Sequence, residues 1–229
     1  MVKKGAVFGS VFGWERPNWF APEGYGIPET ELEKQDFLLQ TSYAPVAEGG
    51  KTREKWSFRR SNYFEFVGSE CLHVHKKVGI LDMSAFSKNI VEGIGAERWL
   101  ESLLANRLPR KVGRIGLCHL LTSKGGVRSE FTVYRINSSQ FYLVSAGSFN
   151  RHDFDYLSKA CPADGTVQLR NITESYGVFV IAGPDSRNLL QKLTDTDLST
   201  DAFPWLSGQN IRLGDAEVKA IRVNFVGEL

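Results

Sequence analysis

Residues 115–146 read IGLCHLLTSKGGVRSEFTVYRINSSQFYLVSA, and this stretch is the strongest indication of the fold class. It contains three runs that are rich in β-branched and aromatic residues, at Ile115–Leu121, Val127–Ile136 and Gln140–Ala146. Short polar segments, Ser123–Gly126 and Asn137–Ser139, separate the runs. Paired Gly or Asn/Ser residues between such runs are typical of β-hairpins. We therefore predict three consecutive antiparallel strands.

Helical and extended segments alternate on both sides of these strands. Apolar residues recur at steps of three and four in the predicted helices, at Asn62–Val78, Ala96–Ala105, Asn150–Cys161 and Pro184–Leu193. Further extended structure is expected at Ile80–Val91, Thr166–Asn171, Gly177–Ala182 and, as a hairpin, Gln209–Val226. Hairpins with interspersed helices favour an α+β fold, with antiparallel sheets and flanking helices, over a doubly wound parallel sheet.

The composition is ordinary for a folded domain. The chain has 229 residues, 28 Lys+Arg against 26 Asp+Glu, a formal net charge of +2 and 42% hydrophobic residues. These values exclude a disordered or collagen-like chain and give no electrostatic reason to expect nucleic acid or an anionic membrane as a partner. Three widely separated cysteines, Cys71, Cys118 and Cys161, indicate a reducing compartment such as the cytoplasm.

Residues 1–60 differ from the rest of the chain. They are rich in Gly, Pro and aromatic residues but show little alternation of polar and apolar side chains. Because flexible linkers lack aromatic residues, we predict an irregular connector arm that its aromatic side chains hold in place.

Glu130 is the strongest functional candidate that the residues alone provide. It lies in a β-branched, aromatic run just after a tight turn, where glutamate is disfavoured. A buried carboxylate there would need a partner or a ligand, because an unpaired buried charge is costly. The alternative is an exposed strand face of Glu130, Thr132 and Tyr134, opposite a buried face of Phe131 and Val133.

Metal and dinucleotide sites receive little support. His73 and His75 lie two residues apart on a predicted helix and point in different directions, so we expect no metal site. Gly93 and Gly95 precede a predicted helix, but the third glycine of a dinucleotide fingerprint is missing.

Five motifs, in order along the chain, resemble the aminomethyltransferase family, the T-protein of the glycine cleavage system. They are Phe12–Phe20 (FGWERPNWF), Val78–Ser84 (VGILDMS), Leu121–Val133 (LTSKGGVRSEFTV), Ala182–Arg187 (AGPDSR) and Arg222–Leu229 (RVNFVGEL). The first resembles the connector before the folate-binding C-terminal half of dimethylglycine and sarcosine dehydrogenases, the branch to which the chain is most similar. The last resembles the opening of the family's terminal motif.

The resemblance implies a folate-binding fold with two interleaved sub-domains after the arm of residues 1–60. The first sub-domain combines residues 61–83 with 172–229, and the second, residues 84–171, is inserted and carries Glu130. The family's third, barrel-like domain would lie beyond Leu229. We therefore expect a C-terminally truncated fragment that is weak or inactive alone.

The activity implied is tetrahydrofolate-dependent transfer of a one-carbon unit, as an aminomethyl group or an iminium carbon, to give methylenetetrahydrofolate. Glu130 falls on the family's catalytic acid, which can relay a proton and stabilise a cation. The tetrahydrofolate-binding positions fall on Phe86, Leu117, Ser145 and Phe225. FAD is expected only if a separate flavin domain precedes the chain.

The donor implied is a small methylated amine or an aminomethyl-lipoyl carrier protein. The location implied is the cytoplasm, or the mitochondrial matrix in a eukaryote. Two alternatives stay open. One is a non-catalytic folate-binding or regulatory protein of the same fold, and the other is a folate-dependent demethylase.

Overall fold

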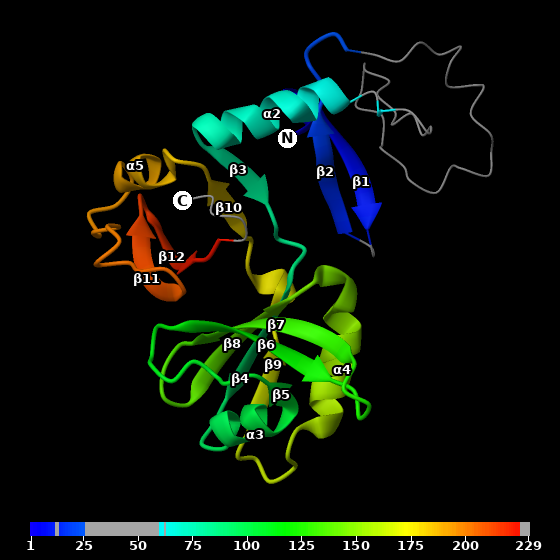
Figure 1. Cartoon of the computed structure of the whole chain (residues 1–229), viewed down its shortest axis with the longest axis vertical. Helices are drawn as coiled ribbons and strands as arrows, with labels where there is room; N and C mark the ends of the chain where they lie inside the picture. Colours follow the sequence, from blue (N-terminus) through cyan, green and yellow to red (C-terminus); the bar gives the residue numbers. More distant parts are fainter. Residues whose placement is uncertain (12–13, 26–59, 62, 225–229) are drawn as a thin grey trace, which may run out of the picture. The chain divides into compact units, whose positions relative to one another are not determined.

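The computed structural model describes residues 1–11, 14–25, 60–61 and 63–224. The chain divides into two compact units, Met1–Gly79 and Ile80–Leu229. Figure 1 traces the order of the helices and strands along the chain.

The first unit contains a β-hairpin and a helix. A 3-10 turn at Val2–Lys4 precedes β1 (Ala6–Val11) and β2 (Trp14–Phe20), which pair antiparallel, and α2 spans Phe64–Lys76. The expectation of irregular structure is wrong for this hairpin. A register shift between Val7 and Phe8, together with Pro17 in β2, breaks the alternation that would reveal the strands in the sequence.

Aromatic packing holds the first unit together. The Trp19 side chain is buried, and its ring lies 5.6 Å from that of Phe66 in α2, nearly parallel to it. Tyr25 and Tyr63 each lie 5.7 Å from Trp19. The remaining predicted arm, residues 26–59, lies outside the described residues.

A six-stranded antiparallel sheet is the main element of the second unit. Its strand order is β5-β6-β7-β8-β4-β9. The strands span Leu104–Ala105, Ile115–Leu121, Val127–Arg135, Gln140–Ser145, Ser87–Glu92 and Gln168–Asn171, in that order. The three predicted consecutive strands form its middle as two hairpins, β6–β7 and β7–β8. This confirms the predicted α+β class with antiparallel sheets.

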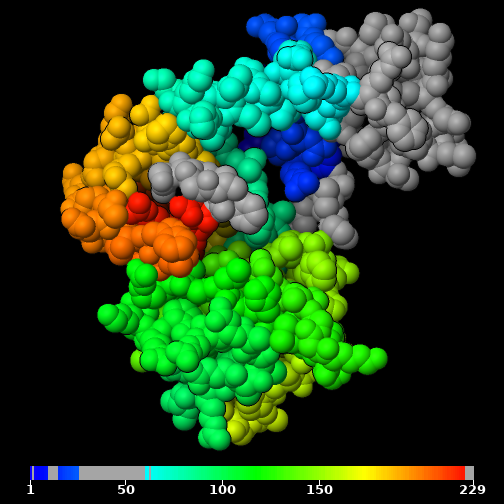
Figure 2. Space-filling view, viewed as in Figure 1, coloured from blue at the N-terminus to red at the C-terminus, as the bar shows by residue number. Residues whose placement is uncertain are grey.

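Different elements pack on the two faces of this sheet. On one face, Phe131, Val133 and Phe141 pack in a core with residues of α3 (Ala96–Leu103) and α4 (Asn150–Ala160). On the other face, Tyr134 and Tyr142 pack against residues of the β11–β12 hairpin and its approach. We call these the helix face and the hairpin face. Figure 2 shows the surface of this sheet and of helices α3 and α4 in green to yellow.

Short elements complete the second unit. The β11 (Ser207–Leu213) and β12 (Ala216–Arg222) strands form the predicted C-terminal hairpin. A two-stranded sheet joins β3 (Gly79–Asp82) and β10 (Phe179–Ala182), and α5 spans Ser186–Gln191. Two 3-10 turns lie at Gly147–Phe149 and Thr173–Ser175. The division into interleaved sub-domains stays a prediction.

No helix among the described residues is both long enough and apolar enough to span a bilayer.

Candidate functional site

Glu130 lies near the start of β7 on the hairpin face of the sheet. Its neighbours Ser129 and Phe131 are buried on the helix face, whereas 58% of the Glu130 side chain is exposed. The structure thus matches the exposed-face alternative at Glu130 but not at Tyr134, which is 5% exposed on the same face. The face is open at one end of β7 and covered at the other.

A row of four residues marks the boundary between the open and covered parts. Strand pairing places Leu117 opposite Thr132, Thr132 opposite Val144, and Val144 opposite Lys88. Leu117, a predicted folate-binding residue, is 46% exposed. It is the diagonal neighbour of Glu130, at a distance of roughly 7 Å. Leu117 and Glu130 therefore share an open part of one sheet face.

The covered part of the same face is aromatic and apolar. The next row consists of four paired residues, Ile115, Tyr134, Tyr142 and Ile90. Leu206 and Ile221 pack against this row. Burial raises the pKa of Tyr134, and burial together with the nearby Tyr176 raises the pKa of Tyr142 to about 12. Both phenols are therefore neutral at physiological pH.

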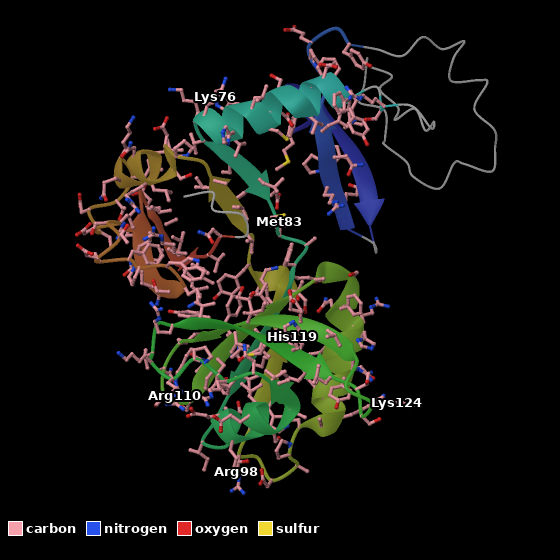
Figure 3. All side chains as sticks on the ribbon, in the orientation of Figure 1. Lys76, Met83, Arg98, Arg110, His119 and Lys124 are labelled. Carbon is pink, nitrogen blue, oxygen red and sulfur yellow. The ribbon has the colours of Figure 1, made fainter. Side chains whose placement is uncertain are left out.

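Glu130 is hydrogen-bonded to His119. The two residues are direct partners in the pairing of β6 with β7, and His119 Nε2 lies 3.0 Å from Glu130 Oε2. The imidazole is 33% exposed. Figure 3 labels His119 among the strands of the sheet. An imidazole and a carboxylate at this distance can share or transfer a proton.

Arg128, two residues before Glu130, is turned away from it. The register of β6 with β7 shifts between Leu120 and Leu121, which is a β-bulge. The Arg128 guanidinium lies over the Tyr156 ring of α4, 4.5 Å from the ring centroid. Because α4 covers the helix face, Arg128 is directed away from the Glu130 carboxylate.

Phe86 lies in the loop that leads into β4, at the same end of the sheet as Glu130. Phe86 directly precedes Ser87, the first residue of β4, which pairs with Ser145 at the end of β8. The buried Lys88 ammonium fixes this loop by donating to the carbonyls of Ser84 (2.7 Å), Phe86 (2.7 Å) and Thr173 (3.0 Å). Burial lowers the pKa of Lys88, and the charge of Asp82 opposes that shift.

Ser145, the third predicted folate-binding residue, points to the helix face. It is 4% exposed, and its hydroxyl donates to Asp153 Oδ2 over 2.8 Å. Ser129 donates to the same oxygen over 2.8 Å, so Asp153 ties β7 and β8 to the first turn of α4. The role of Ser145 in binding folate stays a prediction. The fourth residue, Phe225, lies outside the described residues.

Three functional candidates, His119, Lys88 and Asp153, were not predicted from the sequence. His119 carries a weak signal, because a histidine within a strand that pairs with the Glu130 strand is a natural carboxylate partner. Lys88 and Asp153 carry none, since their roles depend on which backbone carbonyls and hydroxyls the fold brings to them. Among residues 1–11, 14–25, 60–61 and 63–224, no three metal-ligating side chains gather.

Comparison with known proteins places the chain in a family. The GCVT N-terminal domain family matches residues 1–229. The mitochondrial dimethylglycine dehydrogenase of Mus musculus is 37% identical over 229 residues, which are 100% of this chain and 23% of that protein. The aminomethyltransferase of Natranaerobius thermophilus is 28% identical over 181 residues, 79% of this chain and 49% of that protein.

The chain therefore spans between about a quarter and a half of these relatives. A crystal structure of the glycine cleavage system aminomethyltransferase T from Bartonella henselae matches the fold with a TM-score of 0.62. That match has 20% identity and covers 90% of this chain and 44% of that one. The fold and the full-length family match agree with the motifs in the sequence, and the chain belongs to the GCVT N-terminal domain family.

Proposed function

We propose that this chain binds tetrahydrofolate on the open part of the hairpin face and takes part in transfer of a one-carbon unit. The observation that carries the proposal is the exposed Glu130 carboxylate, held beside the exposed apolar Leu117 and next to a covered aromatic row. A flat heterocycle with N–H donors fits such a place, because it can lie on the apolar side chains while its N–H groups reach the carboxylate.

Tetrahydrofolate would supply two nucleophilic nitrogens, N5 and N10, that take up the one-carbon unit as the donor amine leaves. Both N–H protons of the folate are released as N5 and N10 bond to the carbon, and Glu130 relays them in turn to the leaving groups of the donor. An iminium donor takes both protons on its departing amine, whereas an aminomethyl-lipoyl donor takes one on the amine and one on the thiolate, so the protons balance without an external base. The negative charge of Glu130 also stabilises a cationic carbon–nitrogen centre on the donor. Leu117 and the Phe86 loop hold the ring system and exclude water.

The donor and the product belong to the proposal as well. The carbon would come from an aminomethyl group on a lipoyl carrier protein, or from the iminium that a flavin-dependent dehydrogenase forms by two-electron oxidation of a small methylated amine. Methylenetetrahydrofolate would be the product. Membership of a family that includes an aminomethyltransferase and a mitochondrial dimethylglycine dehydrogenase supports both donors and a mitochondrial setting in a eukaryote.

Isothermal titration of the chain with (6S)-5-formyltetrahydrofolate, up to millimolar ligand, tests the proposal. We expect saturable binding that Glu130→Ala weakens roughly tenfold, because a charge-assisted hydrogen bond to the ligand is lost. Glu174→Ala, an exposed glutamate in another element, is the matched control and should bind as the wild type does. Equal affinity of all three proteins would remove Glu130 from the site, and no binding at all would overturn the proposal.

A further inference from the structure

We propose that His119 is the positioning residue of Glu130. Its imidazole holds carboxylate oxygen Oε2 and leaves Oε1 to accept a hydrogen bond from a ligand N–H group. This inference rests on the proposed function, because it assigns a role to Glu130 in binding folate. It adds a residue that the sequence motifs do not include.

The geometry of the pair supports a fixed hydrogen bond. His119 and Glu130 are direct cross-strand partners, and the distance from Nε2 to Oε2 is 3.0 Å. An ionised carboxylate can only accept hydrogen bonds, so the imidazole nitrogen is the donor. The bond uses one carboxylate oxygen and orients the other along a defined direction.

The backbone of His119 is held on both sides. It pairs with Ala105 of β5 on one side and with Glu130 of β7 on the other. Asn106, the residue after β5, donates its side-chain amide to the Leu117 carbonyl over 2.6 Å, which fixes the same part of β6. The imidazole therefore projects from a backbone that two strands and one side chain hold in position.

Two other basic groups of this sheet, Arg128 and Lys88, are directed elsewhere. The bulge sends the Arg128 guanidinium to the Tyr156 ring on the helix face. The Lys88 ammonium is bound by three backbone carbonyls. Pairing of β7 with β8 runs from Thr132 to Arg135, so Glu130 lies beyond it. An exposed glutamate in this position without His119 would sample several rotamers, at an entropic cost to any ligand that needs one of them.

A ligand-free measurement tests the positioning role directly. Three-bond NMR couplings in the labelled chain report whether the Glu130 side chain holds one χ1 rotamer. We expect one rotamer in the wild type, averaging in His119→Ala, and one rotamer again in His119→Gln, whose amide can replace the Nε2 donor. His75→Ala removes an exposed imidazole of α2, and this matched control should leave Glu130 unchanged.

Averaging among χ1 rotamers of Glu130 in the wild type would overturn the inference, and so would a single Glu130 rotamer in His119→Ala. Both outcomes hold whether or not folate binds. A second arm measures the Kd for (6S)-5-formyltetrahydrofolate. His119→Ala should weaken binding roughly fivefold, the scale of one exposed charge-assisted pair, and His119→Gln should stay within about twofold. Binding by the wild type with no loss in His119→Ala would refute the role of His119 alone. Absence of binding by the wild type would refute the proposed function, while the coupling measurement still decides the positioning role.

Discussion

Replacing Asp153 with alanine should destabilise the sheet behind Glu130. Asp153 is fully buried, and its Oδ2 accepts hydrogen bonds from the Ser129 and Ser145 hydroxyls, each over 2.8 Å. Hydrogen bonds to a charged group contribute about 1.5–3 kcal/mol each. Part of this gain offsets the cost of burying the carboxylate. We therefore expect Asp153→Ala to lower the free energy of unfolding by about 3 kcal/mol.

Urea unfolding followed by far-UV circular dichroism measures this loss. Hydrogen exchange of peptides from α4 and β7 assigns the loss to the second unit. Asp155→Ala is a matched control, because Asp155 lies on the same helix with 63% of its side chain exposed and pairs with Lys159 at the surface. That exposed pair is worth less than about 1 kcal/mol. Equal midpoints for Asp153→Ala and Asp155→Ala, or unchanged exchange in α4, would refute the role assigned to Asp153.

Three further substitutions test other contacts. Arg135 forms a bidentate pair with Glu97 and holds the pKa of Glu97 below its usual value. The pair therefore stabilises the fold fully above the unfolded pKa of 4.5, and this contribution is lost as pH falls through the folded pKa. Urea midpoints of Glu97→Gln should therefore fall less on acidification than those of the wild type. Burial lowers the pKa of Lys88 below its unfolded value of 10.5, so between these two pKa values the unfolded state binds more protons than the folded state. In the same urea assay, the wild type should therefore gain stability relative to Lys88→Met as pH rises through that range. A Cβ at Gly147 would lie 2.1 Å from the Ala85 carbonyl oxygen, so Gly147→Ala should cost about 1–3 kcal/mol in thermal unfolding; an unchanged Tm would contradict this packing.

The strands at the middle of the second unit could be predicted because turn residues and apolar runs alternate there. The predicted segments Ile115–Leu121, Val127–Ile136 and Gln140–Ala146 agree with β6, β7 and β8 to within one residue. Strong local signals of this kind do not depend on distant contacts. The hairpin of β1 and β2 was missed because its register shift and proline conceal the alternation.

The pairing of His119 with Glu130 could not be predicted, because one inserted residue decides it. Counted outward from the Leu121–Val127 pair, a regular hairpin would place His119 opposite Ser129 and would put Cys118 beside Glu130. The bulge at Leu120/Leu121 moves the register by one residue and brings His119 opposite Glu130 on the open face. A bulge of this kind leaves no clear sequence pattern, so the site's second polar residue appears only in the structure.

Binding of folate beside Glu130 can be tested by an NMR titration of the isotope-labelled chain with (6S)-5-formyltetrahydrofolate. It maps the binding site and detects weak binding as well. We expect chemical-shift changes that centre on Glu130, His119 and Leu117, extend to the Phe86 loop and disappear in Glu130→Ala. Changes that centre on the helix face, around α3 and α4, or a spectrum that does not change at millimolar ligand, would contradict this expectation.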